Sequence, residues 1–232
     1  MMRHIGGRGR AASSFGGGYG QAMATKRKTA KKSASKSVST QSARPATGSY
    51  TVPGMTLADG HQVGRTLQDR LNSLNDLAMT LKHVHWNVVG PHFIAVHEMI
   101  DPHVVEVRDM VDETAERMAT LGVSPNGTPG ALVASRTWDD YSLGRATTSE
   151  HLGALDSVYD GLIAAHREAQ DSVGELDAVT EDMLIGQIAK LELFQWFVRA
   201  HLESTGGDLA TTGVQDEKTA AKRAARAARS SS

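Results

Sequence analysis

The spacing of apolar residues in four long segments constrains the fold of this 232-residue chain most strongly. In residues 57–88 and 180–204, apolar side chains recur at steps of three and four, which places them on one face of a helix. Two further helices are predicted over 92–121 and 147–173, and no segment alternates with period two over a useful length. The predicted inward-facing residues are Val63, Leu67, Leu71, Leu74, Leu77, Ala78, Leu81, Leu184, Ile188, Leu191, Phe194 and Val198.

The connections between these segments differ in length, and the difference predicts a topology. Gly90 and Pro91 interrupt the pattern between the first two segments, and a short turn also separates the last two. A long connection with a short helical stretch near its middle joins the second segment to the third. We therefore predict an all-α fold, a ferritin-like four-helix bundle over 51–208, with a short extra helix in the long crossover between helices two and three.

The charges divide the chain into an acidic body and two basic ends. Residues 1–50 contain ten Lys or Arg and no Asp or Glu, whereas residues 51–210 carry 10 basic and 24 acidic residues, a net charge of −14. Because residues 1–50 have few large apolar side chains, we predict a disordered basic tail. Residues 209–232 are predicted to be a flexible basic tail, although KTAAKRAARAAR also suits a helix on a surface.

The composition also excludes some kinds of site and location. The chain contains no cysteine, which excludes disulfides and thiolate metal sites. It has no run of 18 apolar residues, and its Arg-rich start lacks the apolar region of a secretory signal. We therefore expect a cytoplasmic, nucleoid-associated protein with no membrane partner, because the basic ends favour a polyanion such as DNA.

Two pairs of candidate metal ligands lie in the second helical segment, within HEMIDPHVVEVRDMVDETAE. His97 and Asp101 are four residues apart, as are Asp112 and Glu116, and all four positions fall within about 100° of one helical stripe. Asp101 and Asp112 are about 16 Å apart along a straight helix, whereas metal–ligand bonds are only about 2.0–2.3 Å long. Each pair is therefore predicted to be half of a metal site.

A two-fold pair of this helix would join the halves. Because a tight turn makes the first two helices antiparallel, His85 is predicted to lie level with His97. If two copies of the second helix cross near residues 106–107, His97 faces Glu116 and Asp101 faces Asp112 in the same register. Two imidazoles and three carboxylates then form each site, which suits iron, manganese or zinc. The alternative is that the carboxylates are ordinary solvated residues and that the histidines bind no metal.

This ladder of ligands resembles that of the Dps family, the DNA-binding proteins from starved cells. The resemblance covers about residues 52–206 and rests on HWNVVGPHFIAVHEMID, DETAER and FQWFVRAHLE. It implies a hollow dodecamer built from two-fold dimers, with iron (Fe2+/Fe3+) bound at a ferroxidase centre shared between two subunits. The implied catalytic and metal-binding residues are His85, His97 and Asp101 of one chain with Asp112 and Glu116 of the other. Trp86 matches a family tryptophan that packs beside the centre.

By this resemblance the chain is a ferroxidase and iron-storage cage. It would oxidise ferrous iron, typically with hydrogen peroxide, store ferric mineral and protect DNA from oxidative damage. The alternative is a nucleoid-compacting DNA-binding protein whose metal site is vestigial or structural. A monomeric di-iron oxidase is disfavoured because one chain lacks a complete site.

The N-terminal tail is the predicted contact with DNA. Its stretch TKRKTAKKSASKS resembles the Lys–Ala–Ser tails of linker histones and has no carboxylate neighbours. Such a segment contacts phosphates without reading bases, and several copies on one assembly act multivalently. The alternative is a tail that only improves solubility. The candidate DNA-binding residues are Lys26, Arg27, Lys28, Lys31, Lys32, Lys36 and Arg44.

Overall fold

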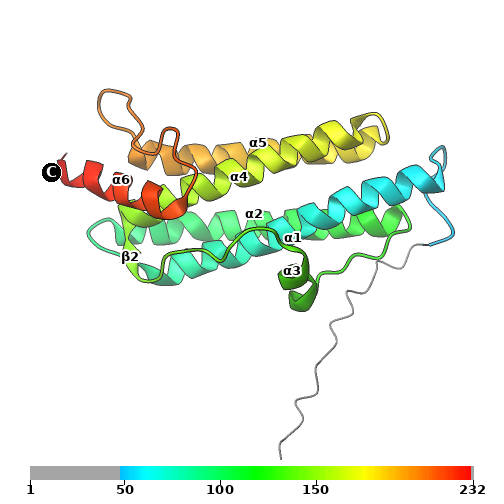
Figure 1. The fold of residues 1–232 in the computed structure, drawn as a ribbon, viewed down its shortest axis with the longest axis horizontal. Helices are drawn as coiled ribbons and strands as arrows, with labels where there is room; N and C mark the ends of the chain where they lie inside the picture. Colours follow the sequence, from blue (N-terminus) through cyan, green and yellow to red (C-terminus); the bar gives the residue numbers. More distant parts are fainter. Residues whose placement is uncertain (1–47, 231–232) are drawn as a thin grey trace, which may run out of the picture. The chain divides into compact units, whose positions relative to one another are not determined.

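The computed structural model describes residues 48–230, which form a helical bundle with one very short strand pair (Figure 1). The helices are α1 (Leu57–Asn87), α2 (Phe93–Thr120), α3 (Pro129–Ser135), α4 (Thr148–Gly174), α5 (Ala178–Leu202) and α6 (Glu217–Ser230). Helices α1 and α2 lie side by side, as do α4 and α5, and α3 lies in the crossover between α2 and α4. The predicted four-helix bundle with a short extra helix in the crossover is confirmed.

Threonine caps fix where three of the helices begin. The side chain of Thr56 accepts a hydrogen bond from the backbone N–H of Asp59 at the start of α1. Thr128 caps α3 in the same way. Thr147 and Glu150 form a reciprocal capping box at the start of α4. Because such caps satisfy backbone donors that have no partner inside the helix, each threonine marks a helix start.

A small parallel strand pair ties the α1–α2 turn to the start of α4. Strand β1 (Val88–Val89) pairs with β2 (Ala146–Thr147), which comes directly before α4. Gly90 follows β1 with φ at 112°, a conformation that favours glycine, and the chain then reverses into α2. The crossover therefore returns beside the end of α1, where two of the candidate ligands lie.

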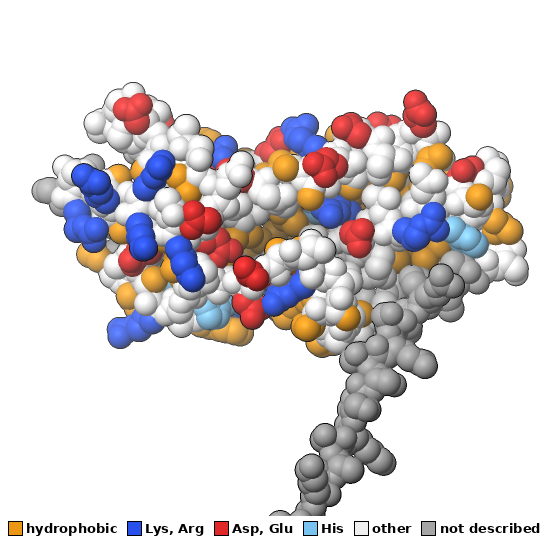
Figure 2. Space-filling view, viewed as in Figure 1, with side chains coloured by type: hydrophobic (Ala, Val, Ile, Leu, Met, Phe, Trp, Pro, Cys, Tyr) orange, Lys and Arg blue, Asp and Glu red, His pale blue; other side chains and the backbone are white. Residues whose placement is uncertain are grey.

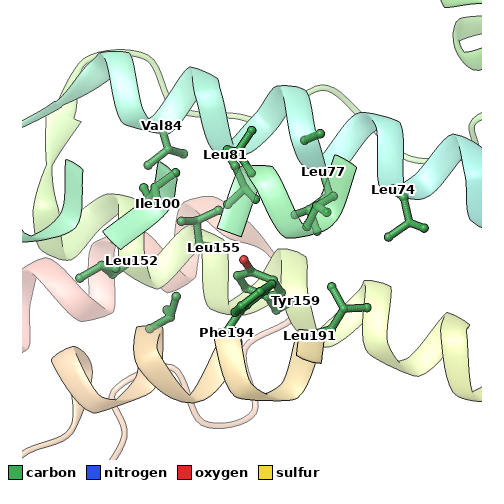
Figure 3. Packing of buried hydrophobic residues seen from close by; sticks show 14 of the residues in the cluster. Leu74, Leu77, Leu81, Val84, Ile100, Leu152, Leu155, Tyr159, Leu191 and Phe194 are labelled. Atoms are coloured by element: carbon green, nitrogen blue, oxygen red, sulfur yellow. The ribbon is translucent and has the colours of Figure 1, made fainter. Parts of the chain in front are cut away.

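The core lies between the two helix pairs, where side chains from all four long helices meet (Figure 3). Leu81 of α1, Ile100 of α2, Leu155 of α4 and Leu191 of α5 are each at most 1% exposed. All twelve residues of the two predicted apolar stripes are buried. The prediction of the inward faces of α1 and α5 is therefore confirmed.

The C-terminal segment differs from the predicted flexible tail, because residues 217–230 form α6 on the surface of α4 (Figure 1). The buried face of α6 consists of Ala220, Ala221, Ala224 and Ala225. A Cβ atom on Gly153 of α4 would lie only 2.7 Å from the backbone oxygen of Ala220, so the glycine permits this close approach. Thr211 fixes the preceding segment by donating a 2.5 Å hydrogen bond to buried Asp156. The predicted N-terminal tail lies outside the described residues as far as residue 47, and the description begins at residue 48.

None of the helices within residues 48–230 is long and apolar enough to span a membrane.

Candidate metal centre

His85 and His97 come from neighbouring helices and lie against each other. His85 is close to the end of α1 and His97 is in the second turn of α2, so the antiparallel turn brings them level, as predicted. Their ring centroids are 3.6 Å apart, with 22° between the ring planes. Phe93 also contacts His97, with ring centroids 5.0 Å apart. The two imidazoles therefore form one compact pair.

The hydrogen bonds of this pair fix which ring nitrogen is free. Each Nδ1 lies 2.9 Å from the backbone carbonyl oxygen of the other histidine. Because a carbonyl oxygen only accepts, each Nδ1 donates a proton to it, and Nε2 is the ring nitrogen left to bind a metal. Metal-binding histidines are commonly held by such a bond from the second nitrogen. The two Nε2 atoms are therefore the candidate metal-binding nitrogens of the pair.

Asp101 lies one turn beyond His97 and is engaged by a lysine. Its Oδ1 accepts a 2.8 Å hydrogen bond from Nζ of Lys82 and lies 3.3 Å from Nδ1 of His85. This hydrogen bond is the main cause that lowers the pKa of Asp101, so the carboxylate is ionised at neutral pH. Nζ of Lys82 also lies 5.7 Å from the ring centroid of Trp86, which is largely exposed.

Lys82 was not predicted as a neighbour of the candidate ligands. A signal was present, because Lys82 precedes His85 by three residues and so shares its face of α1. The contact with Asp101 also depends on how closely α1 and α2 approach, which the spacing within one helix does not give.

Asp112 and Glu116 lie further along the exposed face of α2. Both are exposed, and α2 continues without interruption from Asp101 through Pro102 to reach them. Eleven residues separate Asp101 from Asp112, which is about 16 Å of helix axis. The same face carries Val105, which is 61% exposed between the two carboxylate groups. The geometry of one chain therefore keeps the predicted half-sites apart.

Within residues 48–230 of one chain, no group of three or more histidine, aspartate or glutamate side chains is arranged to hold a metal ion. In the first half-site, Lys82 engages Asp101 and the two imidazole rings stack face to face. A metal site here would need further carboxylates and a free Asp101. Imidazole nitrogens with carboxylate oxygens nevertheless have the donor chemistry that iron accepts.

The predicted DNA-binding residues Lys26, Arg27, Lys28, Lys31, Lys32, Lys36 and Arg44 lie outside the described residues. The described part of the chain carries a second basic surface on α6, where Figure 2 shows Lys and Arg side chains gathered together. The exposed cations of α6 are Lys218, Lys222, Arg223, Arg226 and Arg229. The alanine face of α6 packs on α4, so these charges point outward from a fixed helix.

Comparison with known proteins agrees with this fold. Residues 65–206 match the family described as "Ferritin-like domain". The chain is 56% identical over 178 residues to the "DNA protection during starvation protein" of Mycolicibacterium smegmatis, covering 77% of this chain and 97% of that protein. The chain belongs to the Dps family.

Other relatives extend this assignment. The solved structure "DpsA14 from Streptomyces coelicolor" superimposes with a TM-score of 0.71 at 61% identity, covering 72% of this Dps-family chain and all of that one. The "Fine tangled pili major subunit" of Haemophilus ducreyi is 55% identical over 160 residues, or 69% of this chain and 85% of that protein. The predicted membership of the Dps family and the predicted ferritin-like fold are both confirmed.

Proposed function

We propose that this Dps-family chain is a ferroxidase and iron-storage protein that oxidises ferrous iron, typically with hydrogen peroxide, at a site shared by two chains. One observation carries the proposal. The His85–His97 pair leaves two Nε2 atoms without a hydrogen bond, and Asp101 lies 3.3 Å from Nδ1 of His85 at the same end of an exposed stripe of α2. Asp112 and Glu116 lie at the other end of that stripe.

A second copy of α2, antiparallel to the first, would complete the site. Two apolar residues on the stripe, Ile94 and Val105, are 56% and 61% exposed, as expected for a surface that a partner covers. In a crossing near residues 106–107, Asp112 and Glu116 of each chain approach the histidine pair of the other. We propose two such sites per dimer, and a dodecamer built from these dimers.

The donor set suits the oxidation of iron as a substrate. Carboxylates stabilise ferric iron, and neutral imidazoles supply nitrogen ligands without adding charge. Two ferrous ions supply the two electrons that reduce one hydrogen peroxide, whose O–O bond breaks as two protons are taken up to give water. This pairing limits the release of hydroxyl radical. The net charge of −14 on residues 51–210 raises the local concentration of ferrous ions.

Removing the second half-site tests the proposal. In D112A/E116A, the initial rate of peroxide-dependent ferrous oxidation should fall by at least about tenfold while the assembly keeps its mass. The matched control is D171A/E175A, an exposed carboxylate pair with the same spacing on α4 and its C-cap, which should leave the rate unchanged. A wild-type rate in D112A/E116A would show that these carboxylates are not ligands.

We further propose that the basic segments bind DNA without reading its sequence. Residues 1–50 and the exposed face of α6 carry cations that neutralise phosphates, so affinity should fall steeply with salt. Deleting residues 1–48 should weaken a gel shift and leave iron oxidation intact. K222Q/R226Q should also weaken binding, whereas R65Q/R145Q removes two exposed cations of the body and should not. DNA affinity that is unchanged by the deletion would contradict the role of the N-terminal tail.

A second candidate function is that of a nucleoid-compacting protein with a vestigial or structural metal site. The ion pair between Lys82 and Asp101 favours it, because an ammonium group occupies the space beside a candidate ligand. The two functions differ in one measurement. If the wild-type protein oxidises ferrous iron with peroxide no faster than buffer without protein, DNA compaction is the better assignment.

A further inference from the structure

A cavity of about 330 Å³ lies on a part of the chain that the iron and DNA proposals do not use. Its walls come from α1, α4, the crossover segment after α3 and the start of α6. Figure 1 shows the crossover running across α1 toward β2, and the surface in Figure 2 is hollowed beside it. None of the five candidate metal ligands lines the cavity. Its volume is in the range of small-molecule sites.

The middle of the cavity is apolar and has open space. Leu77 of α1 faces Val158 and Leu162 of α4 across it. Gly161 also lines the cavity, and a Cβ atom added there would meet no atom within 4 Å. The cavity therefore offers a hydrocarbon chain apolar walls, with an exposed edge at Gly161 that carries no side chain.

One end of the cavity carries an unpaired cation. Arg70 of α1 lines it and makes no ion pair or hydrogen bond with any residue of 48–230. One of its nitrogens, Nη1, is buried without a partner. Asp69 and Glu168 act on Arg70 through their charges but form no ion pair with it. A buried guanidinium nitrogen without an acceptor is unfavourable, so this end is suited to an anionic group such as a carboxylate.

The other end of the cavity is acidic. Asp76 is six residues beyond Arg70, about 9 Å along α1. Its oxygens already accept hydrogen bonds from Arg136 at 3.3 Å and from Trp138 at 2.8 Å. Asp139 lines the same end, is exposed and pairs with no cation of the described chain. An ammonium group would find an unpaired carboxylate here.

We propose that this cavity binds a small linear zwitterion, an amino acid whose carboxylate and ammonium groups are separated by a short hydrocarbon chain. The carboxylate would pair with Arg70 and the ammonium with Asp139, while the hydrocarbon lies over Gly161 between Leu77 and Leu162. The two unpaired charges, their opposite signs and the apolar walls between them select this class over a simple anion or a simple amine.

Titration calorimetry on the full-length assembled protein tests the proposal, with 6-aminohexanoate as the probe. Hexanoate and hexylamine, which each keep only one charge, should bind at least about tenfold more weakly than the probe. R70M should weaken the affinity for the probe by about tenfold or more, and D139N should weaken it by about threefold or more. G161M should also abolish binding, because its side chain fills the cavity. G186M is the matched control, since Gly186 of α5 also has open space but does not line the cavity.

Three results would overturn the proposal. The first is no binding of 6-aminohexanoate to the wild-type protein at about 10 mM. The second is an affinity for hexylamine equal to that for 6-aminohexanoate, which would show that Arg70 does not recognise the carboxylate. The third is unchanged affinity in both R70M and G161M, which would place the ligand elsewhere. Should G161M fail to assemble, R70M and D139N alone decide the outcome.

Discussion

The imidazole rings of His85 and His97 stack 3.6 Å apart, and each Nδ1 bonds the backbone carbonyl of the other residue. This reciprocal arrangement joins the end of α1 to the second turn of α2. It also leaves both Nε2 atoms free, which is the feature on which the proposed half-site rests.

In the proposed site, Lys82 would compete with a metal ion for Asp101, so its removal should strengthen metal binding. Because Asp101 is exposed, the ion pair is weak, and K82M should bind Zn2+, a redox-inert probe, only up to about fivefold more tightly. Calorimetry on the assembled protein measures this. K190M is the control, because Lys190 pairs with Glu106 and contacts no candidate ligand. Weaker binding by K82M would show that the lysine supports the site.

His166 should make the protein less stable as the pH falls. Burial, and secondly the charge of Arg70, lower the pKa of His166 from 6.5 to about 4. Between these pH values the unfolded chain binds a proton at His166 that the folded chain does not. The contribution of neutral His166 to stability is therefore fully present above pH 6.5 and is lost as the pH falls toward 4. The loss from pH 7 to pH 5 should be about 2 kcal/mol.

Urea denaturation at pH 7 and pH 5 measures the contribution of His166. The variant H166L cannot titrate at this position, so its loss of stability at the lower pH should be smaller than that of the wild-type protein. H201L is the control, because His201 is exposed. An equal loss in H166L and the wild-type protein would mean that His166 does not control the acid sensitivity.

Gly153 should be needed for the docking of α6. In G153A the new Cβ atom would meet the backbone oxygen of Ala220 at 2.7 Å and the Cβ of Ala224 at 2.8 Å, so α6 must move away. Trypsin should then cleave at the Lys and Arg residues of α6 at least several times faster, because local opening exposes the backbone. In G186A the added methyl has free space and cleavage should be unchanged. Equal cleavage in the two variants would contradict the close packing of α6.

The long helices and the positions of the candidate ligands followed from local patterns in the sequence. Apolar steps of three and four gave the buried faces of α1 and α5, and a tight turn was enough to place His85 beside His97. Helix α6 was harder to predict as a packed element, because its contact face consists of alanines and its partner Gly153 is more than sixty residues away. Contacts of this kind depend on the approach of two backbones, which periodicity within one segment does not report.

The spacing of residues along the chain also could not predict the polar contacts around the site. Lys82 and Asp101 lie on different helices, and their 2.8 Å hydrogen bond depends on the side-chain conformations of both. The β1–β2 pair involves only two residues on each strand, too few for an alternating pattern. His103 and His166 are buried with little or no polar compensation, and the sequence marks neither as a core residue.

Subunit complementation tests most directly the claim that two chains share each site. H85Q/H97Q loses the first half-site and D112A/E116A the second, so each variant alone should be inactive in peroxide-dependent ferrous oxidation. When the two are assembled together at random, half of the dimers are mixed, and each mixed dimer has one intact site of two. The mixture should therefore recover about one quarter of the wild-type rate. Activity no higher than that of either variant alone would contradict a site shared between subunits.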